Sequence, residues 1–141
     1  MPNYATFEAG NPDTWSQWKF KHPLLERSAR GKLFLRELLG LTGMEVSLNT
    51  LPPSAAMPFL HTHREHEELY VFLSGSGEFQ VDGERFPVTP GALVRVAPAG
   101  ERSWRNTGDE PLVYIVIQAK QGTVTCDTIA DGVPVPSKAP W

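Results

Sequence analysis

The strongest constraint on the fold is a series of short apolar runs that begins at Met44 and is interrupted by proline, glycine and aspartate. Runs that recur roughly every 8 to 12 residues are typical of all-β sandwiches and barrels. In EFQVDGERFPV, Asp82 and Gly83 form the kind of pair that adopts positive φ in a two-residue hairpin turn. Pro90 and Gly91 predict another turn, and LVYIVIQA predicts a strand buried on both faces. We therefore predict an all-β fold.

The first part of the chain does not show this pattern of short apolar runs. Residues 1–30 carry Trp15 and Trp18 among prolines and polar residues. This composition predicts an irregular arm whose aromatic side chains dock on a sheet or on a partner subunit. Within residues 31–43, four apolar side chains share one helical face and Gly40 could end a helix, so one short helix is expected. The four apolar residues are Phe34, Leu35, Leu38 and Leu39.

The length of the chain indicates one structural domain. A domain of 141 residues can bury a sizeable core without disulfides, and the only cysteine, Cys126, has no partner for an internal bridge. We expect three segments: an N-terminal arm with the short helix packed on the barrel (1–43), the barrel itself (44–119) and a C-terminal extension (120–141). The aromatic arm and the tryptophan at the end of the tail predict a homodimer that exchanges N-terminal segments.

Charge and hydropathy exclude several classes of partner. Thirteen Lys and Arg residues are scattered among sixteen Asp and Glu residues, for a net charge of -3, so the concentrated positive face that binds nucleic acid is missing. The N-terminus has neither the basic start nor the apolar core of a secretory signal. No apolar run reaches the roughly 18 residues that a membrane helix requires. We expect a cytoplasmic protein that binds neither nucleic acid nor a membrane.

The stretch FLHTHREHEELYVFLSG concentrates groups that bind metals. In a strand, residues two apart point to the same side, so His61 and His63 would face one way. Glu68 begins the next strand and can return beside them, whereas Glu67 points to the opposite face. The polar turn between, which includes His66, is expected to be exposed. Two imidazoles and one carboxylate favour zinc, iron, manganese or nickel, although a solvated hairpin end remains the alternative.

These residues resemble the first motif of the cupin superfamily, G-x5-H-x-H-x3-4-E-x6-G. Its positions fall on Ala55, His61, His63, Glu68 and Gly75, and only the leading glycine departs. The spacing to the final glycine selects Glu68 over Glu67. The resemblance covers about residues 44–119. It implies a double-stranded β-helix, the jelly-roll or cupin barrel, with one divalent transition metal held by His61, His63 and Glu68.

The second cupin motif, G-x5-P-x-G-x2-H-x3-N, is degenerate in this chain. Anchored on Gly91 and Asn106, it has alanines at the proline and glycine positions and Arg102 where the fourth metal ligand, a histidine, belongs. A shift of one residue would place Ser103 there instead. The resemblance therefore implies three protein ligands rather than four.

Arg102 cannot bind a metal because guanidinium stays protonated and has no free lone pair. It could clamp an anionic ligand over the open side of the metal. It could pair with Glu68 and take the electrostatic role of the metal in a metal-free pocket. It could also turn outward and solvate the rim. Tyr70 and Phe72, on the face of Glu68, and Trp104 are expected within reach of the pocket, with barrel packing as their alternative role.

The resemblance leaves the function open because cupins include isomerases, dioxygenases, decarboxylases and proteins with no known reaction. We expect a small organic molecule, either neutral or anionic, as ligand, activated by the metal if the protein is an enzyme. One alternative is a metal-free cupin that binds or senses a small molecule, with Arg102 in place of the metal's charge. Another alternative is a metal ion that only stabilises the folded barrel.

Overall fold

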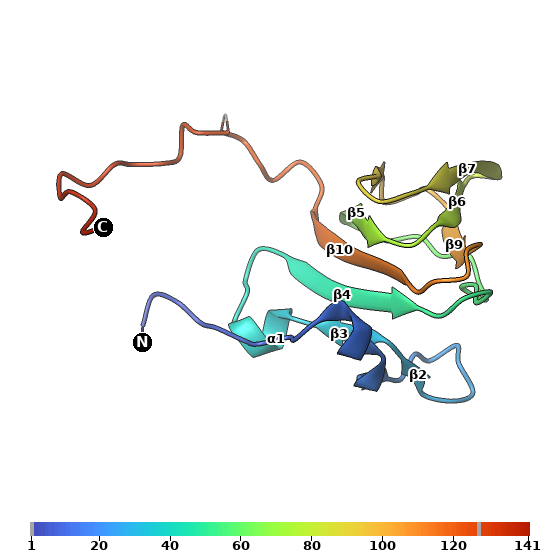
Figure 1. The fold of residues 1–141 in the computed structure, drawn as a ribbon. Coiled ribbons are helices and arrows are strands. Elements are labelled where there is room, and N and C mark those ends of the chain that lie inside the picture. Colours follow the sequence, from blue (N-terminus) through green and yellow to red (C-terminus); the bar gives the residue numbers. More distant parts are fainter. Residues whose placement is uncertain (1, 127) are drawn as a thin grey trace.

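Two antiparallel sheets form the body of the computed structural model, which describes residues 2–126 and 128–141 (Figure 1). The larger sheet has the strand order β3-β4-β10-β5-β8 and the smaller has the order β7-β6-β9. Their strands are β3 (Lys32–Phe34), β4 (Glu45–Leu51), β5 (His66–Ser74), β6 (Gly77–Val81), β7 (Glu84–Val88), β8 (Leu93–Val96), β9 (Arg102–Asn106) and β10 (Leu112–Lys120). A separate pair, β1 (Lys19–Phe20) and β2 (Ala29–Arg30), precedes them. The predicted all-β jelly-roll barrel is confirmed.

The predicted turns join these strands. Asp82 and Gly83 have φ of 52° and 86° between β6 and β7, as a two-residue turn with positive φ at both positions requires. Gly91 has a φ of 90° just before β8. Glycine adopts this region without the steric cost that other residues incur. The local turn chemistry therefore agrees with the strand pairing around it.

Alternate residues of the strands point into the space between the sheets. The core there consists of Tyr70, Phe72, Phe79, Val88, Val96, Trp104, Leu112, Tyr114 and Val116. The ring of Phe79 lies 4.8 Å from that of Tyr70 and 5.7 Å from that of Trp104. His66 and Glu68 precede Tyr70 on the same face of β5. Polar side chains therefore occupy the barrel interior next to the end of this apolar core.

The N-terminal arm covers the outer face of the larger sheet. It contains a short 3-10 helix, η1 (Pro12–Gln17), which lies beside β3 and β4 (Figure 1). Trp15 is buried against Leu48 and Val113, and its Nε1 donates to the carbonyl oxygen of Ala9 at 3.2 Å. The aromatic residues of the arm thus dock on a sheet of their own chain.

The helix expected within residues 31–43 is shorter than its apolar pattern indicates. Only α1 (Arg36–Leu39) is helical, and Gly40 ends it with a φ of 68°. The preceding residues form strand β3, in which Lys32 pairs with Asn49 of β4. Pairing with the edge of the sheet overrides the helical pattern, because local propensity is weak beside tertiary context. As a result, Lys32 faces the barrel interior.

The chain beyond Lys120 forms no strand or helix within the described residues, and its side chains are exposed. Trp141 is fully accessible, and so is not packed on the barrel. None of the helices in the described part of the chain is long and apolar enough to cross a membrane. The division into arm, barrel and extension and the exchanged homodimer stay predictions.

Candidate metal centre

The two histidines lie on an extended segment that runs along β9, and not in a strand as predicted. The backbone of His61 exchanges two hydrogen bonds with that of Arg102, each of 3.1 Å. The backbone N–H of His63 donates to the carbonyl oxygen of Pro98 at 2.9 Å. Prolines in PPSAAMP interrupt the ladder before these residues, since proline has no N–H to donate. The segment is nevertheless fixed firmly enough to aim both imidazoles inward.

His61, His63 and Glu68 converge as the sequence predicts. The Oε1 of Glu68 lies 3.7 Å from Nε2 of His61 and 3.2 Å from Nε2 of His63. One potential ligand atom from each residue lies within 4.8 Å of the others. The two rings are 5.3 Å apart, nearly perpendicular to each other. Each side chain therefore reaches the same small volume from a different direction.

The three side chains suit a divalent metal ion. Nδ1 of His61 and Nε2 of His63 are buried without a hydrogen-bond partner in the described structure. Buried polar atoms are normally paired, so such orphans indicate a missing partner. Two ligand atoms about 2.1 Å from one ion are roughly 3.0–3.4 Å apart at tetrahedral or octahedral angles. The distance between His63 and Glu68 falls in that range.

The carboxylate of Glu68 is held in its ionised form. Its side chain is buried, and the hydroxyl of Tyr70 donates to its Oε1 at 2.7 Å. Burial raises the pKa of Glu68, but the imidazoles of His61 and His63 beside it and the hydrogen bond from Tyr70 outweigh this effect and lower the pKa far below its usual range. Glu68 is therefore available as an anionic ligand over the whole physiological pH range.

Arg102 is fully buried beside this carboxylate. Its Nε lies 3.6 Å from Oε1 of Glu68, and its Nη2 donates to the carbonyl oxygen of Ala97 at 2.8 Å. Nε and Nη1 have no hydrogen-bond partner in the described part of the chain. The possibility that Arg102 turns outward to the rim is therefore wrong, because Ala97 and Glu68 draw the guanidinium inward. Two of its donors therefore lack an acceptor among the described residues, and the side chain exposes no surface to solvent.

The other residues predicted to lie near the pocket, Tyr70, Phe72 and Trp104, pack in the core of the barrel. Trp104 lies in the core with its ring 6.0 Å from that of His61, and its Nε1 donates to the hydroxyl of Tyr114 at 2.8 Å. Tyr70 supports Glu68 from the same core, where Phe72 also packs. Glu67 points away from the cluster, as its position in the strand predicts.

The expectation that His66 lies exposed in a turn is wrong, and Gln118 is a further polar residue that the sequence pattern does not single out. His66 is half-buried rather than exposed in a turn, and its ring stacks 6.3 Å from that of His63. Its Nδ1 lies 2.8 Å from Oε1 of Gln118. The sequence does contain the information that places His66 in the site. His66 lies two residues before Glu68, and residues two apart in a strand point to the same face.

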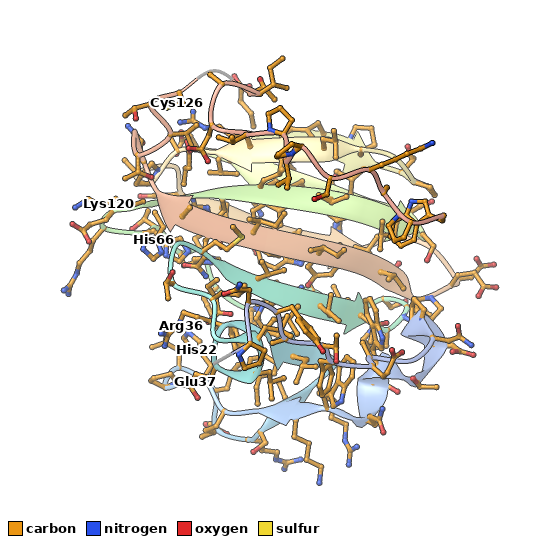
Figure 2. All side chains as sticks on the ribbon, turned by 90° about the vertical axis from the view of Figure 1, so that its left-hand side faces the viewer. His22, Arg36, Glu37, His66, Lys120 and Cys126 are labelled. Atoms are coloured by element: carbon orange, nitrogen blue, oxygen red, sulfur yellow. The ribbon has the colours of Figure 1, made fainter. Side chains whose placement is uncertain are left out.

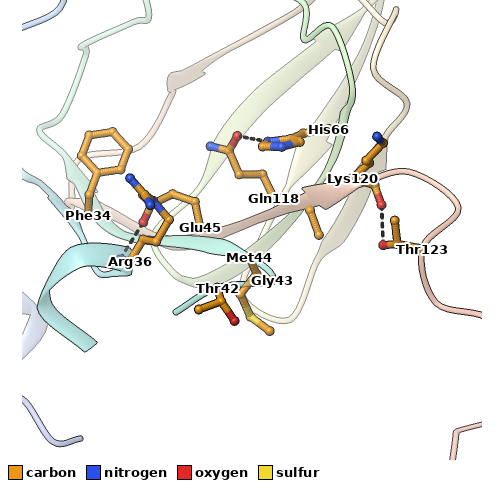
Figure 3. A pocket seen from close by; sticks show the side chains of 11 residues that line it. Phe34, Arg36, Thr42, Gly43, Met44, Glu45, His66, Gln118, Lys120 and Thr123 are labelled. Atoms are coloured by element: carbon orange, nitrogen blue, oxygen red, sulfur yellow. Dashed lines mark hydrogen bonds and ion pairs between the residues drawn. The ribbon is translucent and has the colours of Figure 1, made fainter. Parts of the chain in front are cut away.

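A cavity of about 570 Å³ has His66 and Gln118 in its wall, whereas His61, His63 and Glu68 are not among its lining residues (Figure 3). Gln118 connects the cavity to the cluster, because its strand position pairs with Glu68 on one side and with Glu45 on the other. Directly opposite residues on one face of a sheet are about 5 Å apart. Figure 3 shows the imidazole of His66 against Gln118 in the cavity wall, and Figure 2 places His66 and Lys120 at one end of the sheet. A small molecule in the cavity would reach the edge of the metal site.

Comparison with known proteins matches the model of the cupin domain to residues 47–118. The chain is 33% identical over 82 residues to an uncharacterized protein of Methanocaldococcus jannaschii, which covers 55% of this chain and 66% of that protein. It is also 33% identical over 76 residues to a glucose-6-phosphate isomerase of Pyrococcus horikoshii, covering 50% of this chain and 40% of the isomerase. The chain thus spans two thirds or less of the length of these relatives.

Solved structures show the same architecture. A cupin protein of Bacteroides fragilis superimposes with a TM-score of 0.71 at 37% identity, over 83% of this chain and 97% of that one. A protein of Acidithiobacillus ferrooxidans described as a sugar phosphate isomerase superimposes with a TM-score of 0.58 at 30% identity, over 63% of this chain and 58% of that one.

Proposed function

Because the chain belongs to the cupin family, we propose that it is a metal-dependent enzyme for a small anionic organic molecule, with the ion held by His61, His63 and Glu68. The observation that carries this proposal is the convergence of the imidazoles of His61 and His63 on the buried carboxylate of Glu68, with one buried nitrogen of each ring left without a hydrogen-bond partner in the described structure. A divalent ion bound there would supply Lewis acidity to an oxygen atom of the ligand.

The substrate class we favour is a phosphorylated sugar or a similar small phosphorylated carbonyl compound. Two of the similar proteins are described as a glucose-6-phosphate isomerase and a sugar phosphate isomerase. Arg102 adds support from this chain itself, because the positive charge of its buried guanidinium beside Glu68 favours a negatively charged ligand. We therefore propose isomerisation as the reaction.

The residues of the cluster and of the cavity wall have separate roles in this proposal. Tyr70 and Arg102 orient Glu68 through contacts of 2.7 Å and 3.6 Å with its Oε1. Gln118 orients His66, and when Nδ1 of His66 carries the proton, its Nε2 has a free lone pair that can accept a proton from the substrate. His66 is thus the side chain that we propose for proton transfer.

Proton NMR can measure isomerisation as the incorporation of deuterium from the solvent into the substrate. The compounds to compare are fructose 6-phosphate and other sugar phosphates, with the same sugars lacking the phosphate as controls. We expect exchange of the phosphorylated compounds by metal-loaded protein and a loss of at least about a hundredfold in His63→Ala. Thr62→Ala is the matched control, because its exposed side chain lies between the two histidines. Equal exchange with chelated and metal-loaded protein would refute a metal-dependent reaction.

A second candidate is a metal-free binding protein. The approach of Arg102 to Glu68, at 3.6 Å, favours it because this cation balances the carboxylate without an ion. Such a protein would bind its ligand equally well before and after metal removal. Calorimetric titration of chelated and metal-loaded protein with the same sugar phosphate separates the two functions.

A further inference from the structure

Lys32 brings a second cation into the barrel interior. Its strand, β3, pairs with β4, and its side chain extends over the polar inner face of β4. The ammonium nitrogen lies 2.8 Å from Oδ1 of Asn49 and 3.1 Å from Oγ of Ser47. It also lies 5.0 Å from the centre of the Phe34 ring, which lines the cavity. Lys32 is not itself among the lining residues, but it is only partly buried and its ammonium lies over the Phe34 ring of the cavity wall.

The partners of Lys32 are themselves held in place. Nδ2 of Asn49 donates to the backbone oxygen of Ser47 at 3.0 Å and to that of Tyr114 at 3.3 Å. These contacts turn the amide oxygen of Asn49 toward Lys32. Two of the three ammonium hydrogens are accounted for by Asn49 and Ser47, and the third remains for another acceptor. Such an arrangement preorganises a cation for binding.

A divalent ion in the interior would require an anion. Two carboxylates, Glu68 and Glu45, stand against two cations, Lys32 and Arg102, before the charge of any metal ion is added. Glu45 also pairs with Arg36 at 3.5 Å, so these residues leave no negative charge to balance the ion. An excess of buried positive charge is costly unless a partner compensates it. A ligand with an acidic group would supply the missing negative charge.

We propose that Lys32 binds the acidic group, a phosphate or a carboxylate, of the small molecule that occupies the cavity. This inference rests on the proposed function, since it places the remote anion of the same ligand. Ser47 and Asn49 are positioning residues that hold the ammonium. The metal would bind the reacting oxygen atoms, while Lys32 holds the opposite end of the molecule.

The pKa of Lys32 is consistent with this placement of its ammonium group. Burial lowers the pKa of Lys32 to about 8, although the carboxylates of Glu68 and Glu45 raise it in part. A bound anion favours the charged ammonium and must therefore raise this pKa. Binding of phosphate or carboxylate can thus be followed at Lys32 itself, without any assay of turnover.

The test is calorimetric titration of the full chain, metal-stripped and metal-loaded, with inorganic phosphate and with acetate. We expect Lys32→Met to weaken the binding of one or both anions by roughly tenfold or more in both forms. Lys32→Arg should retain most of the affinity because it keeps the charge. Lys19→Met is the matched control, since Lys19 is an exposed strand residue on β1. The anion that loses more affinity identifies the acidic group.

Unchanged affinity of Lys32→Met for both anions would overturn the proposal. A second measurement on the wild-type protein avoids any folding defect of the variant: the pKa of the Lys32 amine, followed by NMR, should rise by about one unit when phosphate or acetate saturates the site. An unchanged pKa with both anions would also overturn it. Because the metal-stripped protein is included, failure of metal binding would leave this test intact and would be seen separately.

Discussion

Replacing Glu68 by glutamine is expected to destabilise the metal-free protein by about 3–5 kcal/mol, the usual cost of removing one partner from a buried ion pair. Glutamine can still accept a hydrogen bond from Tyr70, but it leaves Arg102 and Lys32 without a compensating charge in the interior. Urea denaturation in the presence of a chelator measures this difference in the free energy of unfolding without a contribution from metal.

Glu67→Gln is the matched control for this prediction. Glu67 is the next residue on the same strand, and its carboxylate lies 2.9 Å from Arg95 on the exposed outer face. Exposed pairs of this kind contribute at most about 1 kcal/mol, so this variant should unfold close to the wild type. Similar midpoints for the two variants would show that the charge of Glu68 is not needed inside the barrel.

Replacing Arg102 by histidine is expected to raise the affinity for a divalent metal by about tenfold or more, and to weaken the binding of anions. The backbone of residue 102 is paired directly with that of His61, so an imidazole there would stand beside the existing ligands. The change also removes the cation that competes with the metal for Glu68. Titration with zinc and with cobalt in a competing chelator measures the affinity.

Arg105→His is the control for this experiment. Arg105 lies on the same strand, β9, but its side chain is exposed and pairs with Glu78 at 2.9 Å. We expect no change in metal affinity there. If Arg102→His binds zinc no more tightly than the wild type does, the interpretation of Arg102 as the residue that replaces a fourth ligand is wrong.

The sequence predicts the all-β barrel and the grouping of His61, His63 and Glu68 because both depend on local spacing. The Asp82-Gly83 turn requires only two adjacent residues that tolerate positive φ. The metal cluster requires two histidines two residues apart and one glutamate five residues after the second, at the start of β5. Each of these features is determined within a short segment of the sequence, so each can be predicted before the packing of distant segments is known.

The remaining site residues depend on contacts between distant segments. The apolar pattern within residues 31–43 predicts a short helix, whereas the direction of the Lys32 side chain follows from the pairing of its strand with Asn49 on β4. Gln118 reaches the site only because β10 lies between β4 and β5. The direction of Arg102 follows from its contacts with Glu68 and Ala97. Such long-range packing overrides local sequence preference.

The most direct test of the metal centre is the metal content of untagged protein, measured by elemental analysis after saturation with divalent transition ions and removal of the excess. Wild type and Thr62→Ala should each retain about one equivalent per chain, whereas His61→Ala and His63→Ala should retain almost none. The same metal content in all four proteins would contradict the account, because the two imidazoles could not then be the ligands.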